Sequence, residues 1–208
     1  MQDKYWDKVS KNKVFTTPLE IESFSKRVNK NAQILDLGCG YGRTLKTLNN
    51  MGYKNLHGAD ISKEMLKRAK NEADFAKYLF VDDGIIDAKD NSFDAVLIIA
   101  VLTSNPFTKD QINMIKEVKR VLKKDGIIYI NDFLINNDER NEIRYKKFLN
   151  KYNTYGVFEL DEGVILRHHK EEYLMELLSD FEMVSKEKVV YKTMNGNKSN
   201  GIQYIGKL

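Results

Sequence analysis

The chain has 208 residues, 42% of them hydrophobic and 31% charged, and its formal net charge is +4 at pH 7. These values are typical of a globular chain with one domain. The single cysteine, Cys39, excludes an internal disulfide and fits a reducing cytoplasm, and no apolar run is long enough to span a bilayer. The 34 Lys and Arg residues are interspersed with 30 Asp and Glu residues, which is typical of a solvated surface and argues against a nucleic-acid groove. Residues 1–13 lack the apolar core of a signal peptide.

Helix-length and strand-length segments alternate along the first two thirds of the chain. Short apolar runs predict strands over residues 32–37, 55–60, 78–83, 93–102 and 126–133. The sequence predicts helices around and between them, over residues 17–28, 43–52, 62–73 and 108–122. Strands separated by helices imply parallel pairing with right-handed crossovers, and therefore a doubly wound sheet.

The sequence predicts the N-cap residue of three of these helices. Thr17 and Glu20 have the spacing of a capping box, and Thr108 and Gln111 repeat it. Ser62 is the predicted N-cap of the helix that follows the second strand.

The pattern changes after residue 133. The sequence then predicts a helix over 138–152, a hairpin over 156–169, a helix over 170–180 and strands over 181–192 and 201–207. The last two strands are joined by a loop too short for a crossover helix, so they form an antiparallel pair. The predicted fold class is α/β: a doubly wound, mostly parallel seven-stranded sheet with an antiparallel C-terminal hairpin and helices on both faces.

A glycine-rich turn follows the first predicted strand, in the stretch ILDLGCGYGR over residues 34–43. Gly38, Gly40 and Gly42 suit a close approach of backbone to ligand and unusual backbone angles. In a doubly wound sheet, ligands bind at the carboxyl ends of the strands near a topological switch point, where this turn lies. The spacing differs from the dinucleotide fingerprint G-x-G-x-x-G.

Acidic residues end the first three predicted strands. Asp36 ends the first, Asp60 the second, and Asp82 and Asp83 the third. Neighbouring strands bring these carboxylates around one crevice, where they would repel a pyrophosphate and suit a cationic ligand with hydroxyl and amine groups. Alternatively, Asp60 and Asp83 only cap the helices that follow them.

The chain resembles the class I S-adenosylmethionine-dependent methyltransferases, of the small-molecule type. The glycine turn resembles the first motif of this family, and LHGADIS over residues 56–62 resembles the strand whose acid holds the ribose diol. Residues 80–102 and 115–133 resemble two further motifs in the family's order, although Lys124-Asp125-Gly126 replaces the usual Pro-Gly-Gly. The resemblance covers about residues 32–133 and implies S-adenosylmethionine as cofactor, with S-adenosylhomocysteine as product.

The resemblance also implies cofactor-binding residues. Asp36 would position the turn and reach the amino group of the methionine moiety through water, Asp60 would accept both ribose hydroxyls, and Asp82 or Asp83 would accept from the adenine amine, with Asp82 favoured. The full predicted set is Asp36, Gly38, Cys39, Gly40, Tyr41, Arg43, Asp60, Ile61, Asp82, Asp83, Gly84, Ala100, Val101 and Leu102. Cys39 is expected to be a packing residue and not a nucleophile.

Methyl transfer needs proximity and alignment, and needs a base only if the acceptor must lose a proton. His168 and His169 are the candidate catalytic bases. The alternative is that one is solvated while the other packs or caps the helix that begins near Lys170. Asp132 ends the fifth strand without companion carboxylates, so no metal site is expected.

Acceptor binding is expected from the additions to the common core, because the core supplies the cofactor crevice. One addition carries Tyr5 and Trp6, an aromatic pair that forms either a lid or part of the core, and the other is the hairpin over residues 155–169. The candidate substrate residues are Tyr5, Trp6, Thr17, Thr103 and Arg167. Arg167, His168 and His169 would suit an anionic or proton-bearing acceptor, although Arg167 equally suits a surface salt bridge.

We therefore expect one methyltransferase domain over residues 1–208. Its parts are an N-terminal helical lid region (1–31), a cofactor-binding core (32–133), an insertion with a helix and hairpin that forms a possible substrate lid (134–180) and closing antiparallel strands (181–208). The expected partner is a small-molecule acceptor, with no membrane or nucleic acid, in the cytoplasm. The alternatives are an RNA or protein methyltransferase, a non-catalytic S-adenosylmethionine-binding protein, and a nucleotide-dependent oxidoreductase, which the glycine spacing and the acids disfavour.

Overall fold

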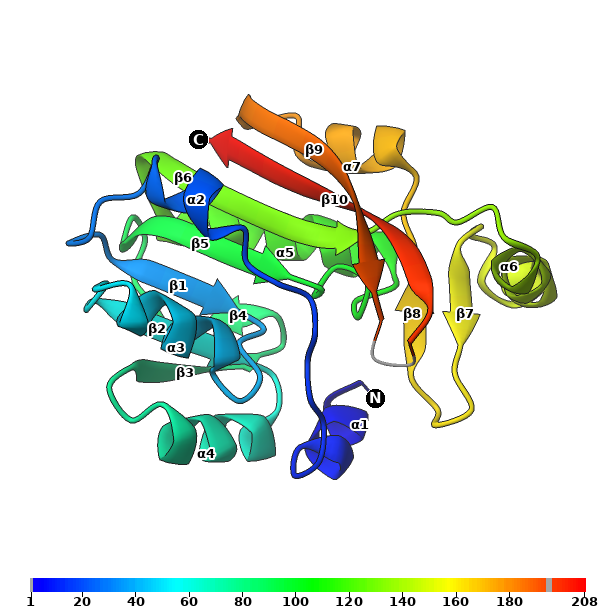
Figure 1. Ribbon diagram of the computed structural model, residues 1–208, viewed down its shortest axis with the longest axis horizontal. Helices are drawn as coiled ribbons and strands as arrows, with labels where there is room; N and C mark the ends of the chain where they lie inside the picture. The colour runs from blue at the N-terminus through cyan, green and yellow to red at the C-terminus, as the bar shows by residue number, and fades with distance from the viewer. Residues whose placement is uncertain (1, 194–195) are drawn as a thin grey trace.

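A mixed eight-stranded sheet runs through the centre of the computed structural model, which describes residues 2–193 and 196–208 (Figure 1). The strands lie in the order β4-β3-β2-β1-β5-β6-β10-β9. Their bounds, in chain order, are β1 Ile34–Leu37, β2 Leu56–Asp60, β3 Lys77–Asp82, β4 Ile85–Ile86, β5 Phe93–Ile99, β6 Leu122–Phe133, β9 Glu182–Lys192 and β10 Lys198–Lys207. β1, β2, β3, β5 and β6 are parallel, and β10 and β9 add antiparallel strands at one edge. The strand order reverses between β1 and β5, so the topological switch point lies there.

Helices cover both faces of the sheet. They are α1 Gln2–Val9, α2 Ile21–Ser25, α3 Arg43–Asn50, α4 Lys63–Glu72, α5 Thr108–Val121, α6 Glu139–Tyr152 and α7 Glu171–Leu177. Side chains alternate along each strand, so Leu35 and Val96 join the core under α5 and α7, whereas Ile34 and Leu97 join the core under α2, α3 and α4. Both core layers are buried, which explains why these strands are almost entirely apolar.

The fold class predicted from the sequence is confirmed, but the sheet has eight strands instead of seven. The additional strand is β4, which pairs antiparallel with the end of β3, with Ile85 opposite Asp82. β10 begins at Lys198, three residues earlier than predicted. The loop predicted over residues 193–200 includes residues 194 and 195, which lie outside the described part of the chain.

Two of the three predicted N-caps are wrong. The second helix begins at Ile21 with Glu20 as its cap, and the carbonyl of Thr17 instead accepts a hydrogen bond from the Arg43 guanidinium. α5 has Phe107 at the cap position with no side-chain hydrogen bond, because the Gln111 side chain turns inward to the carbonyl of Leu102. The Ser62 cap is confirmed, since its hydroxyl accepts from the Met65 N–H at 3.1 Å.

Helices α1 and α6 and the predicted hairpin lie beyond the carboxyl ends of the parallel strands (Figure 1). In Figure 1 the arrowheads of β1, β5 and β6 point toward α1 and toward the hairpin formed by β7 (Val157–Glu159) and β8 (Ile165–Arg167). The predicted hairpin is therefore present and lies next to α6. These segments are the ones expected to enclose a site at this edge of the sheet.

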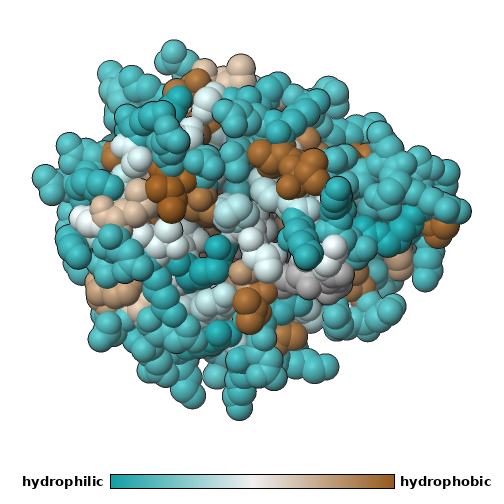
Figure 2. Space-filling view, in the orientation of Figure 1, coloured by the Kyte–Doolittle hydropathy of each residue, from teal (hydrophilic) through white to brown (hydrophobic). Residues whose placement is uncertain are grey.

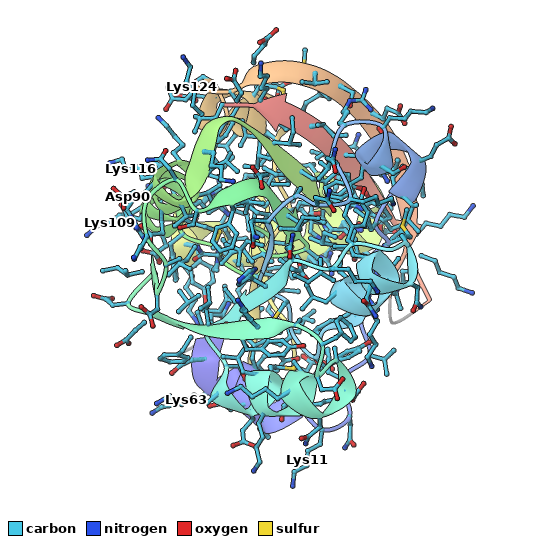
Figure 3. The ribbon with its side chains drawn as sticks, turned by 90° about the vertical axis from the view of Figure 1, so that its left-hand side faces the viewer. Lys11, Lys63, Asp90, Lys109, Lys116 and Lys124 are labelled. Atoms are coloured by element: carbon cyan, nitrogen blue, oxygen red, sulfur yellow. The ribbon has the colours of Figure 1, made fainter. Side chains whose placement is uncertain are left out.

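The surface carries no single dominant patch in the views shown. Figure 2 shows that hydrophilic residues cover most of this face and that apolar residues form small, separate groups. In Figure 3, Lys109, Lys116 and Lys124 project along the upper left edge with Asp90 among them, and Lys11 projects from the bottom of the molecule. None of the helices in the described residues is long and apolar enough to cross a membrane.

The two-layer core makes a direct prediction about stability. Leu97 is fully buried in the middle of β5, so Leu97→Ala should lower the free energy of unfolding by about 2–5 kcal/mol through lost burial and a residual cavity. Val190 on β9 is 64% exposed, and Val190→Ala should change it by less than about 0.5 kcal/mol. Urea denaturation measures both values, and equal effects would contradict the described packing.

Candidate functional site

A cavity of about 760 Å³ lies at the carboxyl ends of the parallel strands. It is lined by the glycine turn, the ends of β2 and β3, the segment after β5, α1, and the hairpin with α6. The sequence-predicted residues that line it are Tyr5, Trp6, Thr17, Asp36, Gly38, Cys39, Gly40, Arg43, Asp60, Ile61, Asp82, Asp83, Gly84, Ala100, Val101, Thr103 and His168. Four predicted site residues do not line it: Tyr41, Leu102, Arg167 and His169.

The glycine turn is packed so closely that side chains are excluded. A Cβ atom at Gly38 would lie 2.4 Å from a methyl group of Val101, and one at Gly40 would lie 2.4 Å from the Phe15 ring. Both glycines have positive φ angles, +74° and +53°, which side chains rarely adopt. Tyr41 stacks on Phe15 at 5.4 Å between ring centroids. Its position therefore indicates that it holds the N-terminal segment against the turn, and corrects the prediction that it contacts the cofactor.

Asp60 connects the glycine turn to the next helix. One carboxylate oxygen accepts from the Gly40 N–H at 2.8 Å, and the other accepts from the Ser62 N–H at 2.9 Å. Burial raises the pKa of Asp60 to about 6, while the hydrogen bonds from Ser62 and Gly40 act in the opposite direction. Each oxygen keeps further acceptor capacity toward the cavity.

Asp36 carries an unsatisfied atom. Its side chain is buried, and Oδ2 has no hydrogen-bond partner among the described residues. Burial raises the pKa of Asp36 to about 7, against the charge of Arg43 and together with the charge of Asp60. A buried polar atom without a hydrogen-bond partner lowers the stability of the fold. A hydrogen-bond donor that enters the cavity would therefore be stabilised by this oxygen.

The end of β3 presents two acids to the same cavity. Asp82 and Asp83 are both exposed, and Asp83 has a positive φ of 45° before Gly84. Ile61 is 38% exposed and also lines the cavity. The structure places all four residues where the sequence predicted them, and both acids stay open as partners for a ligand amine.

Helix α1 is attached to both sides of the cavity. Its Asp7 carboxylate accepts from the Ser62 hydroxyl at 2.6 Å. The Gln2 side chain donates to the carbonyls of Ser104 at 3.1 Å and Ile165 at 2.6 Å. α1 therefore bridges α4 and the β8 strand of the hairpin across the cavity. Trp6 lies between Gln2 and Asp7 on this helix, and its ring centroid is 6.1 Å from that of Phe15.

His168 lines the cavity, but its environment disfavours the predicted role of base. Asn136 is oriented by two backbone contacts: its Oδ1 accepts from the Asn200 N–H and its amide donates to the Leu134 carbonyl. The same amide lies 3.1 Å from His168 Nδ1, and the Tyr145 hydroxyl lies 2.6 Å from it. Nδ1 therefore accepts, and the ring proton is on Nε2. Burial, with the charges of Arg144 and Arg140, lowers the pKa of His168 well below 6.5.

His169 and Arg167 lie in the interior, which corrects the predictions for both. His169 is fully buried, with Nδ1 3.2 Å from the Phe133 carbonyl and Nε2 2.8 Å from the Gln111 amide. Burial lowers its pKa to about 3, so it is neutral and structural. The Arg167 guanidinium donates to the Thr108 hydroxyl at 3.0 Å and stacks on Tyr173. Arg167 thus positions the start of α5 and does not line the cavity, and no ion pair of Arg167 is present among the described residues.

Two further predicted residues, Thr103 and Cys39, have structural roles. The Thr103 hydroxyl donates to the Arg167 carbonyl at 2.8 Å, and its N–H donates to the buried Asp132 carboxylate at 3.1 Å. Burial raises the pKa of the Cys39 thiol well above 9, so the thiol is protonated and suits the packing role expected for it.

The buried acids determine a pH dependence of stability. Asp36 has a pKa of about 7 in the folded protein and an ordinary value of 3.8, so the folded state holds a proton that the unfolded state loses. Its contribution is fully present below about pH 4 and is lost as the pH rises through 7. Relative to wild type, Asp36→Asn should therefore become progressively more stable between these pH values. Urea unfolding at several pH values tests this, with exposed Asp74→Asn as the control. A stability difference independent of pH would contradict the burial of Asp36.

Comparisons with known proteins agree with this geometry. A family model described as "Methyltransferase domain" matches residues 35–130. A crystal structure of a SAM-dependent methyltransferase from Methanosarcina mazei is similar over 92% of this chain and 98% of its own, with a TM-score of 0.85 and 28% identity.

Curated relatives match part of the chain. A protein-lysine N-methyltransferase of Saccharomyces cerevisiae is 31% identical over 64% of this chain and 66% of its own, and a ubiquinone biosynthesis O-methyltransferase of Neisseria meningitidis is 24% identical over 61% and 56%. The chain spans about half the length of the first curated relatives that it matches, two uncharacterized proteins of Methanocaldococcus jannaschii that are 36% and 37% identical over 60% and 53% of this chain. The glycine turn, the strand order and these similarities support a class I S-adenosylmethionine-dependent methyltransferase domain, which the family model matches over residues 35–130.

Proposed function

We propose that the protein transfers a methyl group from S-adenosylmethionine to a small-molecule acceptor by direct displacement. The observation that carries the proposal is the pair of buried carboxylates, Asp36 and Asp60, beside a glycine turn that excludes side chains. S-adenosylmethionine supplies a methyl group that is already activated by its sulfonium charge. The chain therefore has to bind and align two molecules and exclude water, and a general base is not obligatory.

The residues of the cavity fit this cofactor. The unpartnered Oδ2 of Asp36 is suited to a cationic amino group, which would also satisfy a costly buried atom. The Asp60 carboxylate, held by Gly40 and Ser62, has remaining acceptor capacity for two ribose hydroxyls. Asp82 or Asp83 would accept from the adenine amine next to Ile61.

Several features support a small acceptor. α1 bridges α4 and β8 through Asp7 and Gln2, so this helix covers part of the cavity. The 34 Lys and Arg residues are interspersed with 30 Asp and Glu residues, and in Figure 3 Asp90 lies between Lys116 and Lys109 at the left edge. The relatives include methyltransferases named for a quinone pathway and for protein lysine. A protein or RNA acceptor is therefore the alternative that the experiments below distinguish.

The cofactor assignment predicts the effect of removing one carboxylate. Asp60→Ala should weaken binding of S-adenosylhomocysteine by about 1–3 kcal/mol, the cost of losing hydrogen bonds to a charged acceptor. Exposed Asp74→Ala should leave the affinity unchanged. Isothermal titration calorimetry on folded variants tests this, and equal affinities for wild type and Asp60→Ala would refute the assigned role.

The acceptor class predicts where a labelled methyl group goes. When the protein is incubated with methyl-labelled S-adenosylmethionine and a cell extract, label should appear in the low-molecular-weight fraction. Treating separate samples with nuclease and protease should leave that label unchanged. Label found only in protein or RNA would reject the small-molecule acceptor but keep the methyltransferase.

A further inference from the structure

One wall of the cavity differs in charge from the rest. Arg140 and Arg144 of α6 line it, together with apolar residues of the hairpin such as Phe158 and Leu166, and with His168. The carboxylates that line the cavity come from α1, from the ends of β1, β2 and β3, and from α5. The rest of the cavity also has two cations, Lys13 and Arg43, but these are outnumbered by its acids. The wall made by α6 and the hairpin contributes two guanidinium groups and no carboxylate, so the net charge is negative where the cofactor would bind and positive on this wall.

Arg144 is the less solvated of these two cations. Its guanidinium carbon lies 3.6 Å from the centroid of the Phe158 ring, and its Nε atom is buried without a hydrogen-bond partner among the described residues. Burial lowers the pKa of Arg144, which the neighbouring Tyr145 and the more remote Asp138 partly oppose. No ion pair of Arg144 is present in the described part of the chain, whereas Arg140 lies 3.7 Å from Asp138. A partly buried cation usually has an anionic partner, and none of the described residues supplies it.

His168 adds a neutral donor beside this cation. Its ring lies 5.0 Å from the Phe158 ring that Arg144 also covers. Because the NH2 group of Asn136, which can only donate, faces Nδ1 at 3.1 Å, Nδ1 accepts and the proton lies on Nε2. The wall therefore combines a planar guanidinium fork, a ring N–H and an apolar surface.

We propose that this wall binds the carboxylate of an acceptor that has an apolar or aromatic body, with Arg144 as the anionic group's main partner and His168 Nε2–H as a second donor. This inference rests on the proposed methyltransferase function and names the acceptor class. A carboxylate suits the wall better than a phosphate dianion, because Arg144 is the one cation here without an acidic neighbour at ion-pair distance among the described residues. The apolar body would lie on Phe158 and Leu166.

The position of the wall leaves room for the reacting atom. His168 stacks on Phe133 at the end of β6, and β6 is separated from β1 by one strand. With a strand spacing of about 4.8 Å, the wall lies about 10 Å from the glycine turn in the plane of the sheet. The carboxylate is therefore an anchor, and the atom that receives the methyl group lies between this anchor and the cofactor.

The test compares an acid with its neutral amide. Benzoate and benzamide are titrated by calorimetry into protein saturated with S-adenosylhomocysteine. Wild type should bind benzoate at least about tenfold more tightly than benzamide, since hydrogen bonds to a charged partner contribute about 1.5–3 kcal/mol. Arg144→Gln should remove this preference, and so should Arg144→Met, which keeps apolar contact with Phe158. Lys147→Gln, on the same helix but outside the cavity, makes the same change in charge and should retain it.

Three results would overturn the inference: equal binding of acid and amide by wild type, a preference for the acid that survives in both Arg144 variants, or no binding of either probe at millimolar concentration. The titration with S-adenosylhomocysteine alone is the separate control for the proposed function. If wild type fails to bind that ligand, the methyltransferase assignment itself is wrong. If it binds the ligand but does not discriminate between the probes, only the acceptor class is wrong.

Discussion

The Asp60 carboxylate at the end of β2 joins the parts of the site to one another. It accepts from Gly40 in the glycine turn and from Ser62 at the start of α4. The Ser62 hydroxyl donates in turn to Asp7 of α1. One buried carboxylate thus determines the position of the turn, the helix start and the covering helix. The backbone N–H donors partly offset the cost of burying its charge, and a ligand with hydroxyl groups would offset it further.

Two of the unsatisfied atoms around the cavity belong to side chains of opposite charge on different walls. Oδ2 of Asp36 on the cofactor side and Nε of Arg144 on the hairpin side are both buried without partners among the described residues. Both reduce the stability of the unliganded protein, and both would gain a partner from a ligand of opposite charge. The hydrogen bonds of Asp132, Arg167 and Gln111 hold the segment between these walls, so that Val101 stays against Gly38.

Most of the fold could be predicted because its signals are local. An apolar run followed by glycines, as in residues 34–42, predicts a strand and a turn from neighbouring residues alone. Helix caps were less predictable, because Gln111 forms tertiary hydrogen bonds with Leu102 and Asn105 that the capping-box pattern does not reveal. The same applies to Thr17, whose carbonyl bonds to Arg43.

The acidic edge of the cavity was more predictable than the hairpin wall, for the same reason. The acids at strand ends are brought together by parallel pairing, which the order of elements implies. In the hairpin, His168 alone of residues 167–169 lines the cavity, in keeping with the alternation of side chains along an extended chain. Arg144 lies on α6, a helix whose orientation against the hairpin depends on packing with Phe158. No spacing in the sequence relates these two segments.

The central claim is that the acidic edge of the cavity binds S-adenosylmethionine and the hairpin wall faces the acceptor. A crystal structure of the protein with S-adenosylhomocysteine tests this most directly. The account predicts ribose hydroxyls on Asp60, the amino group next to Asp36, and the sulfur atom turned toward the wall of Arg144 and His168. A ligand bound elsewhere, or bound in this cavity with its ribose away from Asp60, would contradict the account.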